Sequence, residues 1–145
     1  MREREERWDA RFMEVAKLAA TWSKDPSKQV GAVIVDSTRR ILGTGYNGFP
    51  RGVDDAWGRY ADREVKLSMV VHAELNAILN AHASLEGATI YVTAPPCSEC
   101  AKAIIQSDIE RIVWCGSLHL SERWAKSLEV SMLMLDEAGI DVEIR

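Results

Sequence analysis

The stretch Ala88-Thr-Ile-Tyr-Val-Thr-Ala-Pro-Pro-Cys-Ser-Glu-Cys-Ala-Lys102 joins a short apolar run to a Cys-x-x-Cys pair. Its apolar run, residues 88–93, predicts a buried strand, and residues 98–107 predict a helix that begins at the cysteine pair. Strands and helices continue to alternate towards the end of the chain. The elements expected there are a strand at 111–115, a helix at 121–137 that stops before Gly139, and a strand at 140–144. This alternation predicts an α/β sheet with helices on both faces.

The first half of the chain predicts a helix followed by a hairpin. Apolar residues at three- and four-residue spacing favour a helix from about residue 5 to residue 22. Residues 55–70 are charged and allow no assignment. We found no linker and no internal repeat, and we therefore expect a single domain over residues 1–145. The other expected elements are two hairpin strands at 30–35 and 41–46, a Gly- and Pro-rich loop at 47–54, and a helix from about His72 to about Ala83.

Composition and charge argue against several classes of protein. The formal net charge is −4, and there is no basic stripe of the kind that holds a nucleic-acid backbone. No apolar run approaches the roughly 20 residues of a membrane-spanning helix, and the charged start of the chain is unlike a signal peptide. Three cysteines are too few, and odd in number, for a disulfide scaffold. We therefore expect a cytoplasmic protein with neither a membrane nor a nucleic acid as partner.

The residue types that carry chemistry gather in two motifs, His72-Ala73-Glu74 and Pro96-Cys97-Ser98-Glu99-Cys100. Each motif lies where a loop is expected to enter a helix, and helix N-termini favour thiolates over thiols. One imidazole and two thiolates suit Zn²⁺ and leave its fourth position open, as in catalytic zinc sites. Glu74 would then lie beside the metal and move protons. This is the His-x-Glu…Pro-Cys-x-x-Cys signature of zinc deaminases.

Other interpretations of these residues stay open at this point. A lone Cys-x-x-Cys pair is also typical of redox proteins, and a histidine at a helix start can simply cap the helix. A structural zinc site would need a fourth ligand, for which His82, His119 and Cys115 are available. The corresponding function would be a non-catalytic nucleotide sensor. Glu74 argues against it, because a structural zinc site requires no carboxylate there.

Several segments in chain order make this sequence similar to the deoxycytidylate (dCMP) deaminase family. The resemblance extends from about Trp8 to Ile144. The zinc motif by itself marks only the wider cytidine-deaminase-like superfamily, whereas the first and third of the segments below narrow the resemblance to the dCMP branch. The segments are Ser23-Lys-Asp-Pro-Ser27, Val30-Gly-Ala-Val33, Gly45-Tyr-Asn-Gly-Phe-Pro-Arg-Gly52, His72-Ala-Glu-Leu-Asn-Ala-Ile78 and Pro96-Cys-Ser-Glu-Cys-Ala-Lys102.

The resemblance implies a three-layer α/β/α sandwich around a mixed five-stranded sheet. It implies that His72, Cys97 and Cys100 hold one catalytic Zn²⁺ and that Glu74 transfers protons between water, N3 of cytosine and the departing amino group. The reaction would be the hydrolysis of dCMP to dUMP and ammonia, which feeds thymidylate synthesis. The same chemistry on C5-modified dCMP, dCTP, free cytidine or a base in RNA is the alternative.

Three further residues are candidates for substrate binding. Asn47 ends a predicted strand where the superfamily uses an asparagine to contact the substrate, although Asn-Gly is also a common turn pair. Lys24 is the candidate for the nucleotide phosphate, with a solvated surface lysine as the alternative. Ala73, between the histidine and the glutamate, completes the set. Arg51, His119 and Arg123 are further candidates for the phosphate.

The loop that follows Asn47 resembles the segment that many family members use to bind dCTP as activator and dTTP as inhibitor. Its candidate residues are Gly48, Phe49, Arg51, Gly52 and Asp54. Glycines permit a close approach of ligand and backbone, but they do not require one. The resemblance also implies a homo-oligomer, either a dimer or a hexamer.

Overall fold

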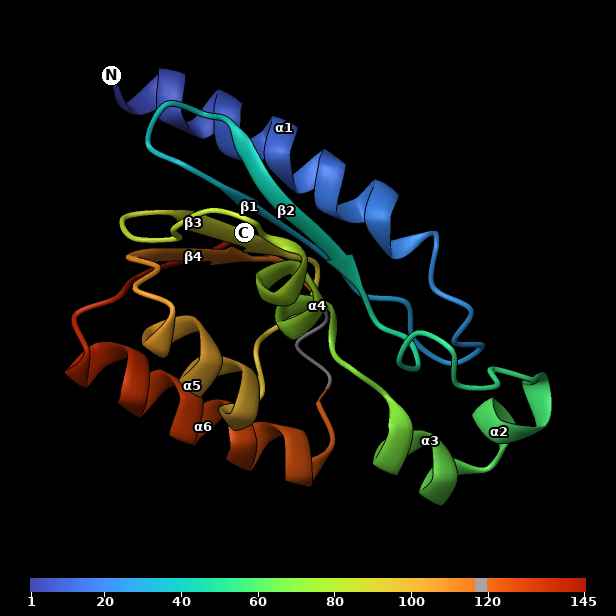
Figure 1. The fold of residues 1–145 in the computed structure, drawn as a ribbon. Helices are drawn as coiled ribbons and strands as arrows, with labels where there is room; N and C mark the ends of the chain where they lie inside the picture. Colours follow the sequence, from blue (N-terminus) through green and yellow to red (C-terminus); the bar gives the residue numbers. More distant parts are fainter. Residues whose placement is uncertain (117–119) are drawn as a thin grey trace.

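A computed structural model describes residues 1–116 and 120–145, and its centre is a five-stranded sheet with the order β2-β1-β3-β4-β5 (Figure 1). Strand β1 is antiparallel to both of its neighbours, β2 and β3, whereas β3, β4 and β5 run parallel. The sheet is therefore mixed, as predicted. The strands are β1 (Gly31–Val35), β2 (Ile41–Tyr46), β3 (Thr89–Val92), β4 (Arg111–Trp114) and β5 (Asp141–Ile144).

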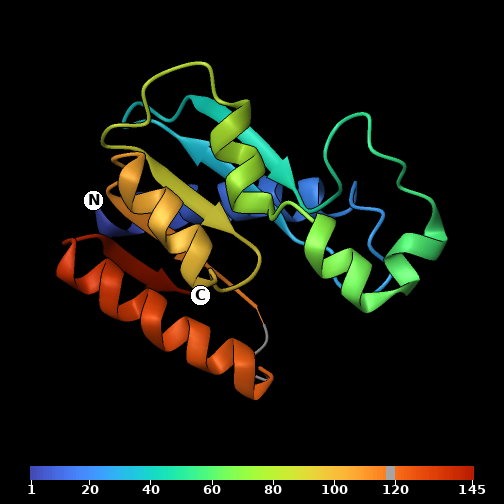
Figure 2. The same ribbon diagram turned by 60° about the horizontal axis from the view of Figure 1, so that its bottom comes forward.

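Helices cover both faces of the sheet, which confirms the predicted three-layer arrangement. One long helix, α1 (Arg2–Ala20), covers one face, while α4 (Ala73–Asn80), α5 (Ser98–Gln106) and α6 (Glu122–Glu137) cover the other (Figures 1 and 2). Two short helices, α2 (Trp57–Ala61) and α3 (Arg63–Met69), lie to one side of the sheet. Within the described residues, no helix combines the length and the hydropathy needed to cross a membrane.

The alternation of side chains along the strands builds two separate apolar layers. In β1, Ala32 and Ile34 join the core under α4, α5 and α6, whereas Val33 and Val35 join the core under α1. All four side chains are buried, which explains why this strand is an unbroken apolar run in the sequence.

The helix that carries Glu74 lies unusually close to strand β2. A Cβ atom at Gly45 would overlap with the backbone of Ala73 and of Ala77 in α4. Only glycine permits this approach, because it has no side chain. Gly45 therefore helps to fix the depth at which the first turn of α4 sits against the sheet.

The boundaries of several elements differ from the prediction for identifiable reasons. The first helix begins at Arg2 because the carbonyl of Met1 accepts the backbone N–H groups of Arg4 and Glu5. The helix after His72 ends at Asn80 rather than Ala83, since Ala81 is already extended. The unassigned residues 55–70 form α2 and α3, and Asp62 caps α3 by accepting the N–H of Val65. Gly139 has φ +74° and ends α6 as expected.

Candidate metal and substrate site

The structure brings together the three residues that the sequence predicts as metal ligands. Nδ1 of His72 lies 3.3 Å from Sγ of Cys97 and 3.4 Å from Sγ of Cys100. His72 is half-buried at the N-cap of α4, and both cysteines are buried at the start of α5. Residues that lie far apart in the sequence thus place one nitrogen and two sulfur atoms at a single point between two helix N-termini.

The local geometry explains why α5 begins here. Cys97 is extended and caps α5, because its sulfur accepts the backbone N–H of Cys100. Free N–H groups and the helix dipole favour the thiolate form at such a position. Hydrogen bonding from Cys100 lowers the pKa of Cys97, and His72 adds to this effect although burial opposes it.

The donor set fits a zinc ion. Tetrahedral zinc with Zn–N and Zn–S bonds of about 2.0 and 2.3 Å places nitrogen and sulfur about 3.5 Å apart. The two distances from His72 to the sulfurs are close to this value. Among residues 1–116 and 120–145 the cluster contains three ligand residues, the number that protein side chains supply in catalytic zinc sites, where the fourth position holds a non-protein ligand.

Glu74 lies beside this cluster at the start of α4. Only 4% of its surface is exposed, and burial raises the pKa of its carboxyl group. Nothing in the packing of an α/β sheet requires a carboxylate at this depth, and buried acids usually occur where a reaction or a ligand needs them. Glu74 is therefore the described acidic group best placed to act on a molecule bound at the metal.

A cavity of about 170 Å³ opens onto the cluster. A space of this order accommodates a single aromatic ring. His72, Ala73 and Glu74 line one side of it, and Trp124 of α6 lies near His72, with 6.3 Å between the ring centroids. The remaining walls come from the segment before β1, from α3 and from the start of the α5 loop, through Asp25, Ser27, Lys28, Val30, Asn47, Arg63, Lys66, Leu67, Val70, Ala94 and Pro95.

Asn47 lines the cavity, but its amide is largely used by the protein. Its Oδ1 accepts the N–H of Val30 at 2.8 Å, and its Nδ2 donates to the carbonyl of Lys28 at 2.9 Å and to Asp25 at 3.3 Å. The side chain is thus held rigidly at the end of β2, with one lone pair of Oδ1 left for a ligand.

Asp25 belongs to the part of the cavity wall that comes from the segment before β1. Its carboxylate accepts the backbone N–H groups of Ser27 and Lys28 and lies 2.8 Å from Nζ of Lys66. Burial raises the pKa of Asp25, but the hydrogen bonds from Lys66 and these two N–H groups outweigh it and lower that pKa overall. This buried ion pair fixes α3 against the cavity.

The other predicted substrate residues lie farther from the cavity. Lys24 is 67% exposed, is paired with Asp55 at 2.8 Å, and is not among the described residues that line the cavity. Arg51 donates to Oδ1 of Asn80 at 2.8 Å, and Arg123 is exposed on α6. His119 lies outside the described residues. The proposed effector loop places Phe49 on the ring of Tyr60, with 4.3 Å between centroids, while Gly52 has φ +80° and both Gly52 and Asp54 are exposed.

The sequence did not identify two parts of the site. Trp124 has the spacing of a core residue, yet it faces the cavity, and Lys28 lies 5.1 Å above its ring. Lys66 and Arg63 come from α3, which the sequence left unassigned. The capping residue Asp62 was the one available signal for that helix.

Comparison with known proteins places this geometry in a family. The model named "Cytidine and deoxycytidylate deaminase zinc-binding region" matches residues 6–116, which include the whole metal cluster. The chain belongs to the cytidine and deoxycytidylate deaminase family. It therefore carries the zinc-binding domain of these deaminases, and its cluster is suited to zinc.

Individual relatives are similar over most of their length. An uncharacterized deaminase in the luxG 3' region of Aliivibrio fischeri is 44% identical over 138 residues, covering 94% of this chain and 92% of the relative. The deoxycytidylate deaminase of Homo sapiens is 42% identical over 141 residues, covering 92% of this chain and 76% of the relative. The dCMP deaminase of cyanophage S-TIM5, solved with dCMP and dUMP, has the same fold, with a TM-score of 0.74, 24% identity, and coverage of 94% of this chain and 95% of that chain.

Proposed function

We propose that this protein hydrolyses dCMP to dUMP and ammonia. The observation that carries the proposal is the buried carboxyl group of Glu74 beside the His72, Cys97 and Cys100 cluster, at the wall of a cavity with room for one ring. Relatives named deoxycytidylate deaminase support dCMP as the substrate, and the one from Homo sapiens is 42% identical to this chain. The cytosol is the proposed compartment, since the two cysteines must stay reduced to bind a metal.

Separate residues bind the metal, transfer the protons and hold the cytosine ring. His72, Cys97 and Cys100 would hold zinc, which as a Lewis acid supplies a water nucleophile at neutral pH. Glu74 would accept one proton from the attacking water and give it to N3 of the cytosine ring. It would then take the second proton, from the hydroxyl group now on C4, and give it to the departing amino group. The C4–O bond forms and the C4–N bond breaks, so that water and dCMP become dUMP and ammonia. Trp124 and Val30 line the cavity that holds the ring.

Ammonia release from dCMP tests the proposal directly. We expect zinc-loaded protein to release one ammonia for each dUMP formed, and we expect activity to disappear after chelation and to return with added zinc. Parallel samples contain C5-methylated dCMP, dCTP or cytidine. No release from dCMP by folded protein with one zinc bound would contradict the proposed reaction. Turnover of one of the other nucleotides alone would reassign the substrate.

We propose that Lys28, in the cavity wall, and Lys24, in the same segment of the chain, bind the substrate phosphate. Lys28 lines the cavity, and Lys24 precedes Asp25 in the same segment. The exposed pair between Lys24 and Asp55 costs little to break, because solvent screens the attraction between exposed charges. Lys24 is therefore available to an anionic ligand, whereas Lys66 is held by Asp25.

Replacing these lysines should weaken binding of the nucleotide only. We expect Lys24→Met and Lys28→Met each to raise KM for dCMP about tenfold, the cost of one lost charge-assisted contact. The KM for deoxycytidine, which lacks the phosphate, should stay unchanged. Lys102→Met is the matched control, because Lys102 is exposed on α5 and pairs with Glu99. An unchanged KM for dCMP in both variants would exclude these lysines from phosphate binding.

We propose that dCTP and dTTP bind this protein and that it forms a homo-oligomer. The family resemblance supports both proposals, and so do two surfaces of the structure, the loop at 48–54 and helix α4. The exposed glycine and charged residues of the loop at 48–54 leave room for a triphosphate. Exposed apolar residues on α4, Leu75 and Leu79, are suited to contact a second copy of the chain. Addition of dCTP and dTTP to the ammonia assay, together with sedimentation of the protein, tests both proposals.

A further inference from the structure

One face of α6 points towards the loop that carries the cysteines. Trp124, Ser127 and Ser131 are spaced three and four residues apart, so they lie along one side of the helix. Trp124 lines the cavity, and α6 packs beside α5 in both views (Figures 1 and 2). The two serines are therefore directed at the start of α5.

Ser131 is completely buried and bonds to Pro96, the residue before the candidate ligand Cys97. Its hydroxyl lies 2.9 Å from the carbonyl oxygen of Pro96 and 3.0 Å from the carbonyl of Ser127 in its own helix. A serine inside a helix commonly bonds only to its own helix. Here the same hydroxyl reaches a neighbouring segment, and it anchors the peptide that leads into Cys97.

Ser127 bonds to the residue after the same ligand. Its Oγ accepts the backbone N–H of Ser98 at 2.9 Å and donates to Oγ of Ser98 at 3.3 Å. The N–H of Ser98 belongs to the first turn of α5 and has no acceptor within its own helix. The two serines thus hold Cys97 from both sides, through Pro96 and Ser98.

We propose that Ser127 and Ser131 are positioning residues that keep the cysteine segment in the geometry which retains the metal. This inference rests on the zinc site of the proposed function. Neither serine touches the three ligand atoms. Both fix the backbone that carries them, and the partners that orient metal ligands usually set metal affinity as well. Helix α6 therefore orients the cysteine ligands through hydrogen bonds to the backbone on either side of Cys97.

Zinc release from the folded protein tests the proposal without an activity assay. We expect Ser131→Ala and Ser127→Ala to release zinc to a chromogenic chelator about tenfold faster than the natural protein, in line with the loss of other outer partners of metal ligands. Ser127→Thr keeps the hydroxyl and should restore slow release. Ser107→Ala is the matched control, since Ser107 bonds within α5 at its far end and should leave release unchanged.

Two further measurements separate positioning from general stability. The visible spectrum of the cobalt-substituted protein should change in the alanine variants and stay unchanged in Ser107→Ala. Thermal unfolding of the metal-free proteins reports stability alone.

Release rates and spectra equal to those of the natural protein would overturn the proposal, even if the variants unfold at a lower temperature. Failure of the natural protein to bind zinc would instead contradict the proposed function. Because Ser127 is only half-buried, its variant remains informative if Ser131→Ala does not fold.

Discussion

Replacing Glu74 by glutamine should lower kcat for dCMP by about 10³-fold, within the range for loss of a general acid–base group. Glutamine has nearly the same shape but cannot accept or deliver the proton. Bulk water cannot replace it efficiently, because only 4% of Glu74 is exposed. The KM should change little, since the carboxyl group acts on the reacting atoms rather than on the sugar or phosphate. Steady-state kinetics with dCMP measure both quantities.

The metal content must be followed in the same variant. Glu74 is not one of the clustered ligands, so Glu74→Gln should still bind one zinc per chain. Glu99→Gln is the matched control, because Glu99 lies between the two cysteines in sequence but is 79% exposed and pairs with Lys102. It should retain normal kinetics. Turnover by Glu74→Gln above one tenth of the natural rate would remove Glu74 from the proposed proton transfer.

The metal cluster could be predicted from the sequence because its residues lie in two short, recognisable motifs. His72 and Cys97 belong to the motifs His-x-Glu and Pro-Cys-x-x-Cys, and the spacing of such ligand residues can be recognised within a few positions of the sequence. The α/β fold could also be predicted from the sequence, because β1 is an unbroken apolar run and α5 follows β3 after a short loop. Periodicity and caps are properties of neighbouring residues, and they can therefore be recognised before the fold is known.

The walls of the cavity could not be predicted in this way. The ion pair between Asp25 and Lys66 joins residues 41 positions apart, and no local pattern selects Lys66 from the other lysines. The same difficulty applies to the phosphate candidate, because the sequence singled out Lys24, whereas Lys28 is the lysine of that segment that lines the cavity. Trp124 shares its helical spacing with core residues, and only the packing of α6 beside α5 turns it towards His72. Such contacts depend on the relative placement of whole elements.

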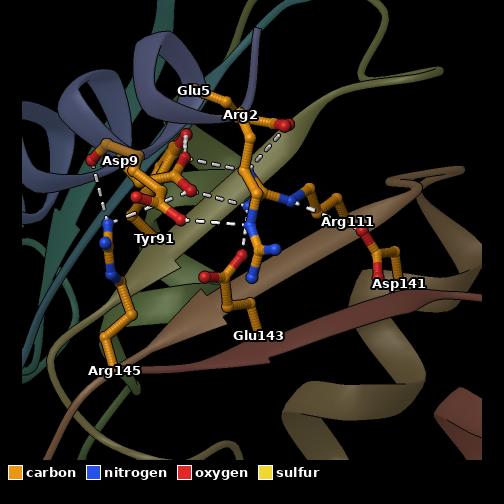
Figure 3. A network of polar contacts seen from close by, with 9 residues as sticks. Arg2, Glu5, Asp9, Tyr91, Arg111, Asp141, Glu143 and Arg145 are labelled. Carbon is orange, nitrogen blue, oxygen red and sulfur yellow. Dashed lines mark hydrogen bonds and ion pairs between the residues drawn. The ribbon is translucent and has the colours of Figure 1, made fainter.

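A second ion-pair network, away from the cavity, joins the first helix to the end of the sheet (Figure 3). Arg111 of β4 donates to both carboxylate oxygens of Asp9 in α1, at 2.8 and 2.7 Å, and to Glu143 of β5 at 2.7 Å. Tyr91 of β3 donates to Asp9 at 2.6 Å. Asp9 is almost fully buried, so its charge depends on Arg111. One guanidinium therefore links α1 to two strands.

Replacing Arg111 by methionine should lower the free energy of unfolding by about 4 kcal/mol at neutral pH, the usual cost of leaving one partner of a buried pair without the other. Asp9 would keep only the hydroxyl of Tyr91 and the guanidinium of Arg145, which is 4.0 Å away. Urea unfolding measures the change. Arg2→Met is the control, since Arg2 is 91% exposed in its pair with Glu6 and should cost less than about 1 kcal/mol.

The pH dependence distinguishes this electrostatic loss from a loss of packing. Burial raises the pKa of Asp9, but hydrogen bonds from Arg111 and Tyr91 outweigh it and lower that pKa below its usual value of 3.8. A lowered pKa in the folded state stabilises the protein above the unfolded pKa, and this contribution is lost as pH falls through the folded one. In Arg111→Met burial remains without its main compensation, so the Asp9 pKa rises and protonation relieves the variant.

The difference in unfolding free energy between the natural protein and Arg111→Met should therefore be largest at neutral pH. It should start to shrink as the pH falls through the raised Asp9 pKa of the variant, and stop shrinking below the lowered Asp9 pKa of the natural protein. The double variant Asp9→Asn/Arg111→Met removes the unpaired charge and should be more stable than Arg111→Met alone at neutral pH. A difference that stays constant with pH, with no recovery in the double variant, would mean that Arg111 acts through the packing of its aliphatic stem. Recovery in the double variant would assign the cost to the buried carboxylate, and it would identify Asp9 as the reason that β4 carries an arginine at this position.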